Sequence, residues 1–511
     1  MTKKITESRN KKTLINIISV IVSQIMSFVY ALLSKKLFLD IFSISAFGVI
    51  DLFSSFFYSL MLLEMGFGTI LIYNLYKPIA LKDEIEINRQ LSIFKTIYSL
   101  ICIIIVFISV IISPFLFDIF NIDFADKLAV YVIYFSNVFT VIVKYSFLNK
   151  ISLVNADGNK YIEVFINIFV EFLSFIVRLA SLLLFKNIYI YLFAQLLLPS
   201  LTYIIENEWI VRNYNIKKIK FASFKEIIDS GVLKQCRKYI YTTIYELTFF
   251  SMDNIIISIA LSTDSISYVS NYIGLINTAS YLIVMVLNSF RGVIANFYHE
   301  SKNDQGLYEV FDVYSNFNFI FTSIISVGMY TMIDNFISIW IGNQYLIDTN
   351  IKFILIFTLA MNGIFESINN VFTIKGYIFK EKWFLISSAL TNFILTIILI
   401  KPFGLFGAYL GTLIAQLVRW VGKVYFVTDG VFVSQKNKII IKYLIYIIFI
   451  SVEMLVMPNI ISLVFVEQGG ICVFVIECVF IIFIVVLING AFVYNNKNFK
   501  LYFINNIKKR F

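Results

Sequence analysis

The sequence has few charged residues. Asp, Glu, Lys and Arg make up only 14% of its 511 residues, whereas hydrophobic residues make up 59% and the mean hydropathy is +0.84. One soluble core could not cover so much apolar surface, so the sequence predicts an all-α, polytopic integral membrane protein. A net charge of +10 would suggest nucleic-acid binding in a soluble chain. No polar domain presents a nucleic-acid-binding surface here, so we expect no nucleic-acid partner. We attribute the excess of positive charge to Lys and Arg residues on the cytoplasmic side.

The residues that build metal and redox sites are also scarce. The chain has one histidine, His299 in a polar connection, and four scattered cysteines, three of which lie in apolar segments. This composition argues against a metal site and against a disulfide framework. No Walker motif is present, so ATP does not drive the protein directly. We expect no cofactor, and no enzyme, because every predicted outer connection is too short to form a catalytic domain.

Long apolar segments dominate the rest of the chain. A bilayer core needs about 20 apolar residues per helix. By that length the sequence contains about fourteen transmembrane helices, six before and eight after the basic stretch 212–238. The predicted helices are 13–34, 45–72, 91–115, 128–147, 162–185, 188–205, 239–261, 266–290, 317–340, 353–372, 383–400, 405–426, 443–463 and 471–494.

The distribution of positive charge orients these helices. With both termini in the cytoplasm, all but seven of the 42 Lys and Arg residues fall in helix ends, loops and tails on the cytoplasmic side, as membrane topology requires. The exceptions are Lys35, Lys36, Lys127, Lys186, Lys352 and Lys401 at outer ends, and Arg178 within a helix. We therefore predict an N-terminal six-helix lobe (1–211), a basic cytoplasmic linker (212–238), a C-terminal six-helix lobe (239–427) and two additional helices with a basic cytoplasmic tail (428–511).

Within the linker, the segment FKEIIDSGVLK has apolar residues at helical spacing. Phe224, Ile227, Ile228 and Gly231 recur on one face, which predicts a short amphipathic helix at the headgroups. A Ser-Ile-Ser repeat at 43–45 and 265–267 occupies the same outer turn in each half and favours an internal duplication.

Charged residues inside the helices are the candidates for function. Each costs about 2.5 to 3.5 kcal/mol near the bilayer centre on insertion scales, so each should face a water-filled cavity. Candidates for binding a coupling proton or sodium ion are Asp51, Glu64, Glu171, Glu246, Asp253 and Glu366. Candidates for binding an anionic substrate group are Lys35, Lys36, Arg178, Arg291 and Arg419. Glu453 and Glu477, in the last two helices, rank lower.

Each candidate also has a structural interpretation, and the residues alone leave both open. Glu171 and Arg178 are seven residues apart on one helix, so they could form an ionic tie. Glu246 and Asp253 have the same spacing and would share one face of a continuous helix. Long arginine side chains near the cytoplasmic boundary could reach the headgroups and only fix the topology. The acids could be neutral, hydrogen-bonded structural groups.

Four stretches resemble one transporter family. They are LLEMGFGTILIYNLYKPIALKDEIEINRQLS (62–92), SMDNIIISIALSTDSISYVSNY (251–272), IWIGNQY (339–345) and TNFILTIILIKPFGLFGAYLGTLIAQL (391–417). Their order and spacing are similar to those of the Wzx-type oligosaccharide-lipid flippases of the multidrug/oligosaccharidyl-lipid/polysaccharide exporter superfamily. The sequence departs from the family by lacking a proline near the start of 239–261 and by having Lys35 and Lys36 where arginine is common.

The resemblance implies two six-helix lobes around a central cavity that opens alternately to each side. The expected substrate is an undecaprenyl-diphosphate-linked oligosaccharide, an O-antigen or capsular polysaccharide repeat unit, flipped to the outer leaflet of the bacterial cell membrane. Expected partners are membrane lipids, a proton or sodium ion, and other polysaccharide-assembly membrane proteins. Alternatives are a cation-coupled multidrug exporter of the same superfamily and, less favoured, a membrane polysaccharide polymerase.

Overall fold

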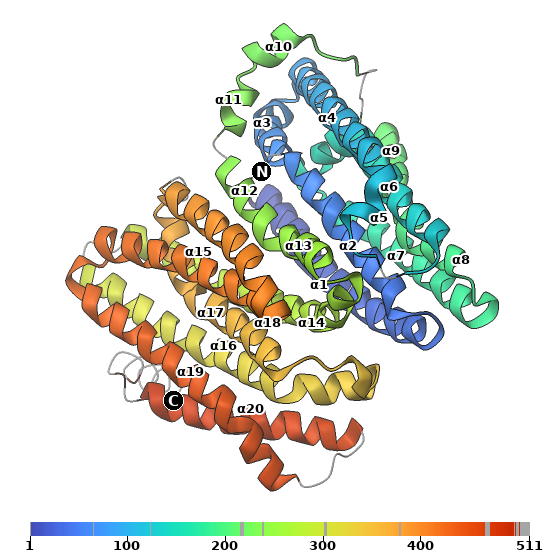
Figure 1. Cartoon of the computed structure of the whole chain (residues 1–511). Helices are drawn as coiled ribbons and strands as arrows, with labels where there is room; N and C mark the ends of the chain where they lie inside the picture. Colours follow the sequence, from blue (N-terminus) through green and yellow to red (C-terminus); the bar gives the residue numbers. More distant parts are fainter. Residues whose placement is uncertain are drawn as a thin grey trace. The chain divides into compact units, whose positions relative to one another are not determined.

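Helices form almost all of the chain that the structure describes. The computed structural model (Figure 1) describes residues 2–64, 66–122, 124–214, 219–237, 240–300, 304–377, 380–465, 471–494, 496 and 500. Across these ranges no strand occurs, and the predicted all-α membrane fold is confirmed. The chain divides into two compact units, Met1–Ser267 and Tyr268–Phe511, which we call unit 1 and unit 2. The functional boundaries expected for the two lobes and the linker remain predictions.

Twelve helices within the described ranges are long and apolar enough to cross a membrane, against the fourteen predicted. The difference has two causes. Helix α18 (Lys382–Gly430) is one 49-residue element that contains both 383–400 and 405–426, with non-helical backbone angles at Gly404. The predicted helix 239–261 is divided into α12 (Ile240–Leu247), the π-helix η6 (Thr248–Met252) and α13 (Asp253–Ala260), each too short to count by itself.

Unit 1 is built from long helices joined by short irregular segments. In it α7 packs against α1, and α6 packs against α4, α3, α9 and α2. Between α7 and α9 the chain forms two π-helices, η3 (Ser181–Phe185) and η4 (Phe193–Leu197), and a 3-10 turn, η5 (Leu198–Ser200). The helices of this unit as far as Asn213 are α1 (Thr2–Ile41), α2 (Ile44–Met61), α3 (Phe67–Leu81), α4 (Glu84–Ile112), α5 (Leu116–Ile119), α6 (Lys127–Ala156), α7 (Lys160–Ala180), α8 (Ile188–Leu192) and α9 (Leu201–Asn213).

The predicted helix 45–72 is interrupted in its second half. Helix α2 ends at Met61, a 3-10 turn follows, and α3 begins after Gly66, whose φ of 76° lies in the left-handed region that glycine tolerates. The break leaves Glu64 just ahead of α3, where its Oε1 accepts a hydrogen bond of 3.1 Å from the backbone N–H of Gly68. A carboxylate in this position satisfies an otherwise unpaired N–H group at the start of a helix.

The segment 224–234, predicted as one short helix, is helical but in two pieces, the second of which continues to Cys236. Helix α10 (Phe224–Asp229) starts with a capping box between Ser223 and Glu226, and α11 (Val232–Cys236) follows Gly231, whose φ is 69°. Because the N–H and hydroxyl groups of Ser223 both donate to the Glu226 carboxylate, the pKa of Glu226 lies below its usual value. Phe224 is 71% exposed, which suits the predicted place at the headgroups, whereas α11 packs against α3.

Unit 2 is organised around α16. This helix packs against α17, α19 and α20, and α17 packs in turn against α18. Glu453 of α19 accepts hydrogen bonds from Ser323 of α16 at 2.5 Å and from Asn489 of α20 at 2.8 Å, so it joins the last two helices to the unit. The helices of this unit are the larger part of α14 (Thr263–Ser289), α15 (Arg291–Glu300), α16 (Asp304–Trp340), α17 (Thr349–Ile374), α18, α19 (Lys436–Val464) and α20 (Ile471–Tyr494).

Small residues let α18 fold back on itself. Gly404 has a φ of 56°, which reverses the chain between the two halves of the helix. After the reversal, Gly407 approaches the first half so closely that a Cβ atom on it would lie 2.1 Å from the carbonyl oxygen of Leu399. The two halves are also joined by a hydrogen bond of 2.6 Å from the Ser388 hydroxyl to the Ala415 carbonyl. This hairpin holds the charged side chains at its open end in place.

We predict that Gly407→Ala destabilises the protein by about 1 to 3 kcal/mol, the usual cost of inserting atoms into a packed interior. Gly328→Ala in α16 is the matched control, because a Cβ at Gly328 meets no atom within 4 Å. Replacing a helical glycine with alanine at such a site should be neutral or stabilise by about 0.5 to 1 kcal/mol. Thermal unfolding in detergent measures both variants, and equal melting temperatures would contradict the close approach.

Candidate functional site

Five charged side chains, three of them buried, gather in unit 2. Arg291 is the first residue of α15, Glu366 lies in α17, Glu381 directly precedes α18, and Arg419 and Lys423 lie one turn apart in α18. We call these five residues the cationic cluster. Residues at i and i+4 lie on one face of a helix, so Arg419 and Lys423 are presented together.

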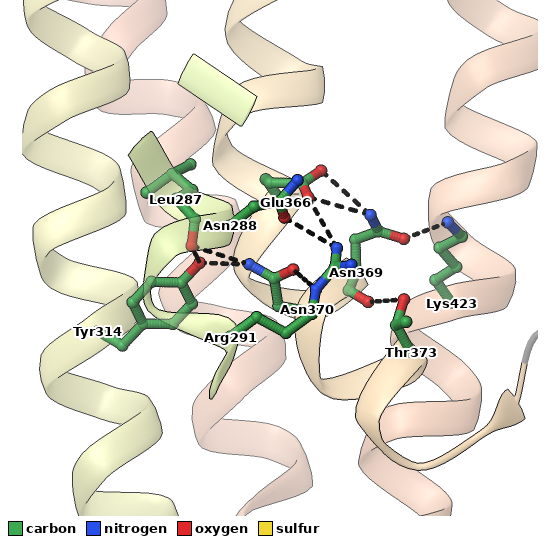
Figure 2. Close-up of polar contacts among 9 residues, drawn as sticks. All are labelled: Leu287, Asn288, Arg291, Tyr314, Glu366, Asn369, Asn370, Thr373 and Lys423. Carbon is green, nitrogen blue, oxygen red and sulfur yellow. Dashed lines mark hydrogen bonds and ion pairs between the residues drawn. The ribbon is translucent and has the colours of Figure 1, made fainter. Parts of the chain in front are cut away.

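Two hydrogen bonds and one ion pair fix the Arg291 guanidinium. Its Nε donates to Asn370 Oδ1 at 2.8 Å, one terminal nitrogen donates to Asn288 Oδ1 at 2.8 Å, and the same nitrogen lies 3.9 Å from Glu366 Oε1 (Figure 2). Asn370 is itself held, because its amide donates to the Tyr314 hydroxyl at 2.6 Å. The Arg291 side chain nevertheless stays 36% exposed, so its guanidinium is positioned but accessible.

Asn369 connects the two ends of the cluster. Its amide nitrogen donates to both oxygens of Glu366, at 3.1 and 3.2 Å, and its amide oxygen accepts from Lys423 Nζ at 2.6 Å (Figure 2). The Lys423 side chain is only 3% exposed and lies 3.3 Å from Glu381 Oε1. Arg419 Nε lies 2.7 Å from the same oxygen. One carboxylate oxygen therefore serves two cations.

The charges of the cationic cluster do not balance. It contains three cations and two carboxylates, so it has one cation more than acids, and Arg419 and Lys423 share the carboxylate of Glu381. Desolvating such charges is costly unless they are paired, so the excess favours an anionic ligand near the accessible member, Arg291. The predicted residues Arg291, Arg419 and Glu366 are thus brought into one network. Lys423 and Glu381 were not predicted, although the i, i+4 spacing from Arg419 could have indicated Lys423.

In unit 1, Arg178 and Glu171 form the ion pair that their spacing suggested. One terminal nitrogen of Arg178 lies 2.7 Å from Glu171 Oε1, and the other donates to Gln195 Oε1 of η4 at 2.6 Å. Arg178 is only 5% exposed. The pair therefore ties α7 to η4, and a substrate role for it remains a proposal.

Among the other predicted residues of unit 1, Lys35 of α1 and Asp51 of α2 interact electrostatically. Lys35 is half-buried with its ammonium 4.0 Å from the centre of the Phe47 ring, and Lys36 is exposed. Glu64 caps α3, as described above. Asp51 lies in α2, which packs against η6 and α13.

Glu246 and Asp253 flank the π-helix η6. Glu246 lies in α12, and Asp253 is buried as the first residue of α13. The wider turn of η6 changes the rotation between them, so the shared face expected for a continuous α-helix does not follow from their spacing.

Metal-ligating residues do not gather in the described part of the chain. No group of three or more His, Cys, Asp or Glu side chains there is placed to hold a metal ion. The four cysteines are free thiols. The side chain of His299 lies outside the described residues.

Comparison with solved structures identifies the fold. The structure described as "Lipid II flippase MurJ, inward closed conformation" matches with a TM-score of 0.66 and 17% identity over 94% of this chain and 99% of that chain. The chain shares the fold of this flippase. An inward-facing MATE multidrug resistance transporter of the MOP superfamily matches with a TM-score of 0.53 and 12% identity, over 83% and 99% of the two chains. A MATE protein in complex with MaL6 gives 0.50 and 13%, over 84% and 97%.

These neighbours are transporters and flippases rather than enzymes. At such low identities they establish the fold and the multi-pass membrane architecture. No protein-family model matches the sequence, and no curated protein matches it either.

We predict that Glu381→Ala destabilises unit 2 by about 3 to 5 kcal/mol, because it leaves Lys423 and Arg419 without the carboxylate between them. Asp429→Ala is the control. It breaks a comparable ion pair, Lys436–Asp429 at 2.6 Å, whose side chains are 40% and 36% exposed, and should cost at most about 1 kcal/mol. Thermal unfolding in detergent measures the stability of both variants. Similar losses of stability would show that the buried Glu381 carboxylate contributes no more than the exposed one.

Proposed function

We propose that the protein is a flippase for a lipid-linked oligosaccharide. The proposed substrate is an undecaprenyl-diphosphate-linked O-antigen or capsular repeat unit, moved by alternating access from the cytoplasmic to the outer leaflet of the bacterial cell membrane. The support comes from the motif resemblance to Wzx-type flippases, the fold shared with the lipid II flippase MurJ, and the charge of the cationic cluster. The orientation with both termini in the cytoplasm belongs to this proposal, as do coupling to a proton or sodium ion and association with other polysaccharide-assembly proteins.

The excess positive charge of the cationic cluster is the observation that carries the substrate class. A diphosphate and several sugars cannot cross hydrocarbon unaided, because their polar groups would lose all hydrogen bonds to water. A guanidinium is suited to phosphate oxygens, since it can donate two parallel hydrogen bonds and stays charged. Arg291 is the most exposed of the three cations, at 36% against 23% for Arg419 and 3% for Lys423. In this proposal it contacts the diphosphate, and the two buried cations strengthen the positive field.

A multidrug exporter is the second candidate, favoured by the fold shared with MATE transporters. The two candidates differ in the charge that the substrate site must carry. An organic cation would bind best beside unpaired carboxylates, whereas the described charges of the cationic cluster include one cation more than acids. We therefore prefer the anionic, lipid-linked substrate.

The test is a flipping assay in proteoliposomes that contain fluorescent undecaprenyl-diphosphate oligosaccharide. We expect the labelled headgroup to reach the opposite leaflet faster than in protein-free vesicles. Vesicles loaded with a fluorescent organic cation serve as the comparison. Headgroup movement no faster than in empty vesicles, or transport of the organic cation alone, would contradict the proposal.

A narrower prediction concerns Arg291. Arg291→Ala should lower the flipping rate about tenfold or more, because a hydrogen bond to a charged group contributes about 1.5 to 3 kcal/mol. Arg291→Lys should retain part of the rate, since lysine keeps the charge but loses the forked geometry. Arg212→Ala is the control, because that side chain is 79% exposed and only 4.0 Å from Glu208 in a surface pair. Equal rates for the wild type and Arg291→Ala, with both proteins folded, would remove Arg291 from the substrate site.

A further inference from the structure

A small cavity in unit 1 is lined by two acids that belong to none of the charge pairs described above. They are Glu163 of α7 and Glu206 of α9. The cavity has a volume of about 10 Å³, room for roughly one water-sized species. Its other lining residues are apolar or aromatic: Ile151, Val154, Ile162, Ile166, Trp209 and Ile210.

Three of the four carboxyl oxygens of these acids are buried and have no hydrogen-bond donor among the described residues. Glu206 is only 4% exposed, and both of its carboxyl oxygens are buried without a hydrogen-bond partner in the part of the chain that the structure describes. The same holds for Oε2 of Glu163. A buried carboxylate in this situation is strongly disfavoured unless a cation or a proton joins it.

Several polar groups of the neighbouring elements have hydrogen-bond partners other than the two acids. From α6, Lys150 donates to Asn207 Oδ1 at 2.6 Å. After α6, Asp157 accepts from the Tyr214 hydroxyl at 2.8 Å, and from α1 the Asn16 amide oxygen accepts from the backbone N–H of Tyr161 at 2.7 Å. Tyr203 of α9 interacts electrostatically with both acids. The other titratable or charged residues near them in the sequence on α6, α7, α9 and their connections are Lys150, Asp157, Lys160, Tyr161, Glu208, Arg212 and Tyr214.

The lining of the cavity decides which cation fits. Calcium takes six to eight oxygen ligands and magnesium a complete octahedron, and the apolar walls add no oxygen to the two carboxyl groups. A proton needs only a carboxyl oxygen, and a protonated carboxyl group becomes a donor to its neighbour. We propose that Glu163 and Glu206 form a proton-binding site in unit 1.

This site is distinct from the ion pair on the same helix. Glu163 and Arg178 are fifteen residues apart, roughly 22 Å along α7 at the usual rise of 1.5 Å per residue. Proton binding here requires no substrate and holds whether or not the chain flips a lipid-linked glycan. If the proposed function is also correct, the site supplies a titratable group that a change in the packing of α7 against α9 would expose to water.

The test uses the full-length protein in detergent without substrate. Dicyclohexylcarbodiimide reacts with protonated carboxyl groups in apolar surroundings, and peptide mass spectrometry locates the label. We expect labelling of Glu206 at neutral pH that decreases as the pH is raised, and loss of the α9 label in Glu206→Gln. Glu208→Gln is the matched control on the same helix, since the Glu208 side chain is 61% exposed, and should leave the label unchanged.

Two results would overturn the proposal. One is the absence of label on both Glu163 and Glu206 at every pH, and the other is protection of Glu206 by sodium chloride but not by choline chloride, which would indicate a metal-cation site. A second measurement uses the wild-type protein, so it does not depend on whether a variant folds. Its infrared spectrum should contain the carbonyl band of a buried carboxylic acid that disappears at high pH, and a spectrum without this band would contradict a proton held in the cavity.

Discussion

The constraint on which this structure depends is that hydrocarbon satisfies neither a backbone group nor a side-chain charge. Helices solve the first problem by themselves, but each buried charge needs a partner from another segment. In the cationic cluster, the carboxylate of Glu381 pairs with both Arg419 and Lys423, and the Asn369 amide forms hydrogen bonds with both Lys423 and Glu366. These contacts fix the ends of α15, α17 and α18 against one another. The same interactions that stabilise the unit therefore also position the group most suited to bind an anion.

Interruptions of the helices coincide with the charges. The π-helix η4 supplies Gln195 to Arg178, and η6 separates Glu246 from Asp253. Such segments occur frequently at functional sites, because the wider turn leaves backbone groups free and changes the direction of the following side chains. Gly404 has a comparable effect in α18, where a left-handed residue turns one long element into a hairpin.

The sequence predicted the membrane class, nearly all the helices and three members of the cationic cluster. It could not predict the partners, because the pairing of Arg291 with Asn370 joins residues 79 positions apart and depends on helix packing. Glu206 was missed for another reason. Average hydropathy ends the predicted helix at Ile205, whereas α9 continues to Asn213 and buries an acid beyond the apolar stretch. A window average cannot tell a buried charge from a solvated one.

The two units differ in the sign of their uncompensated charged groups and in whether that charge depends on pH. The cationic cluster of unit 2 has an excess of guanidinium and ammonium groups, and arginine does not lose its proton in proteins, so its attraction for an anion is constant. The acids of the unit 1 cavity can exist with or without a proton, so their charge depends on pH and on access to water. A transporter needs both kinds of group. Recognition of the substrate requires a charge that persists through the cycle, whereas coupling to an ion requires a group whose affinity changes with conformation. The proposed roles of the two sites follow this division.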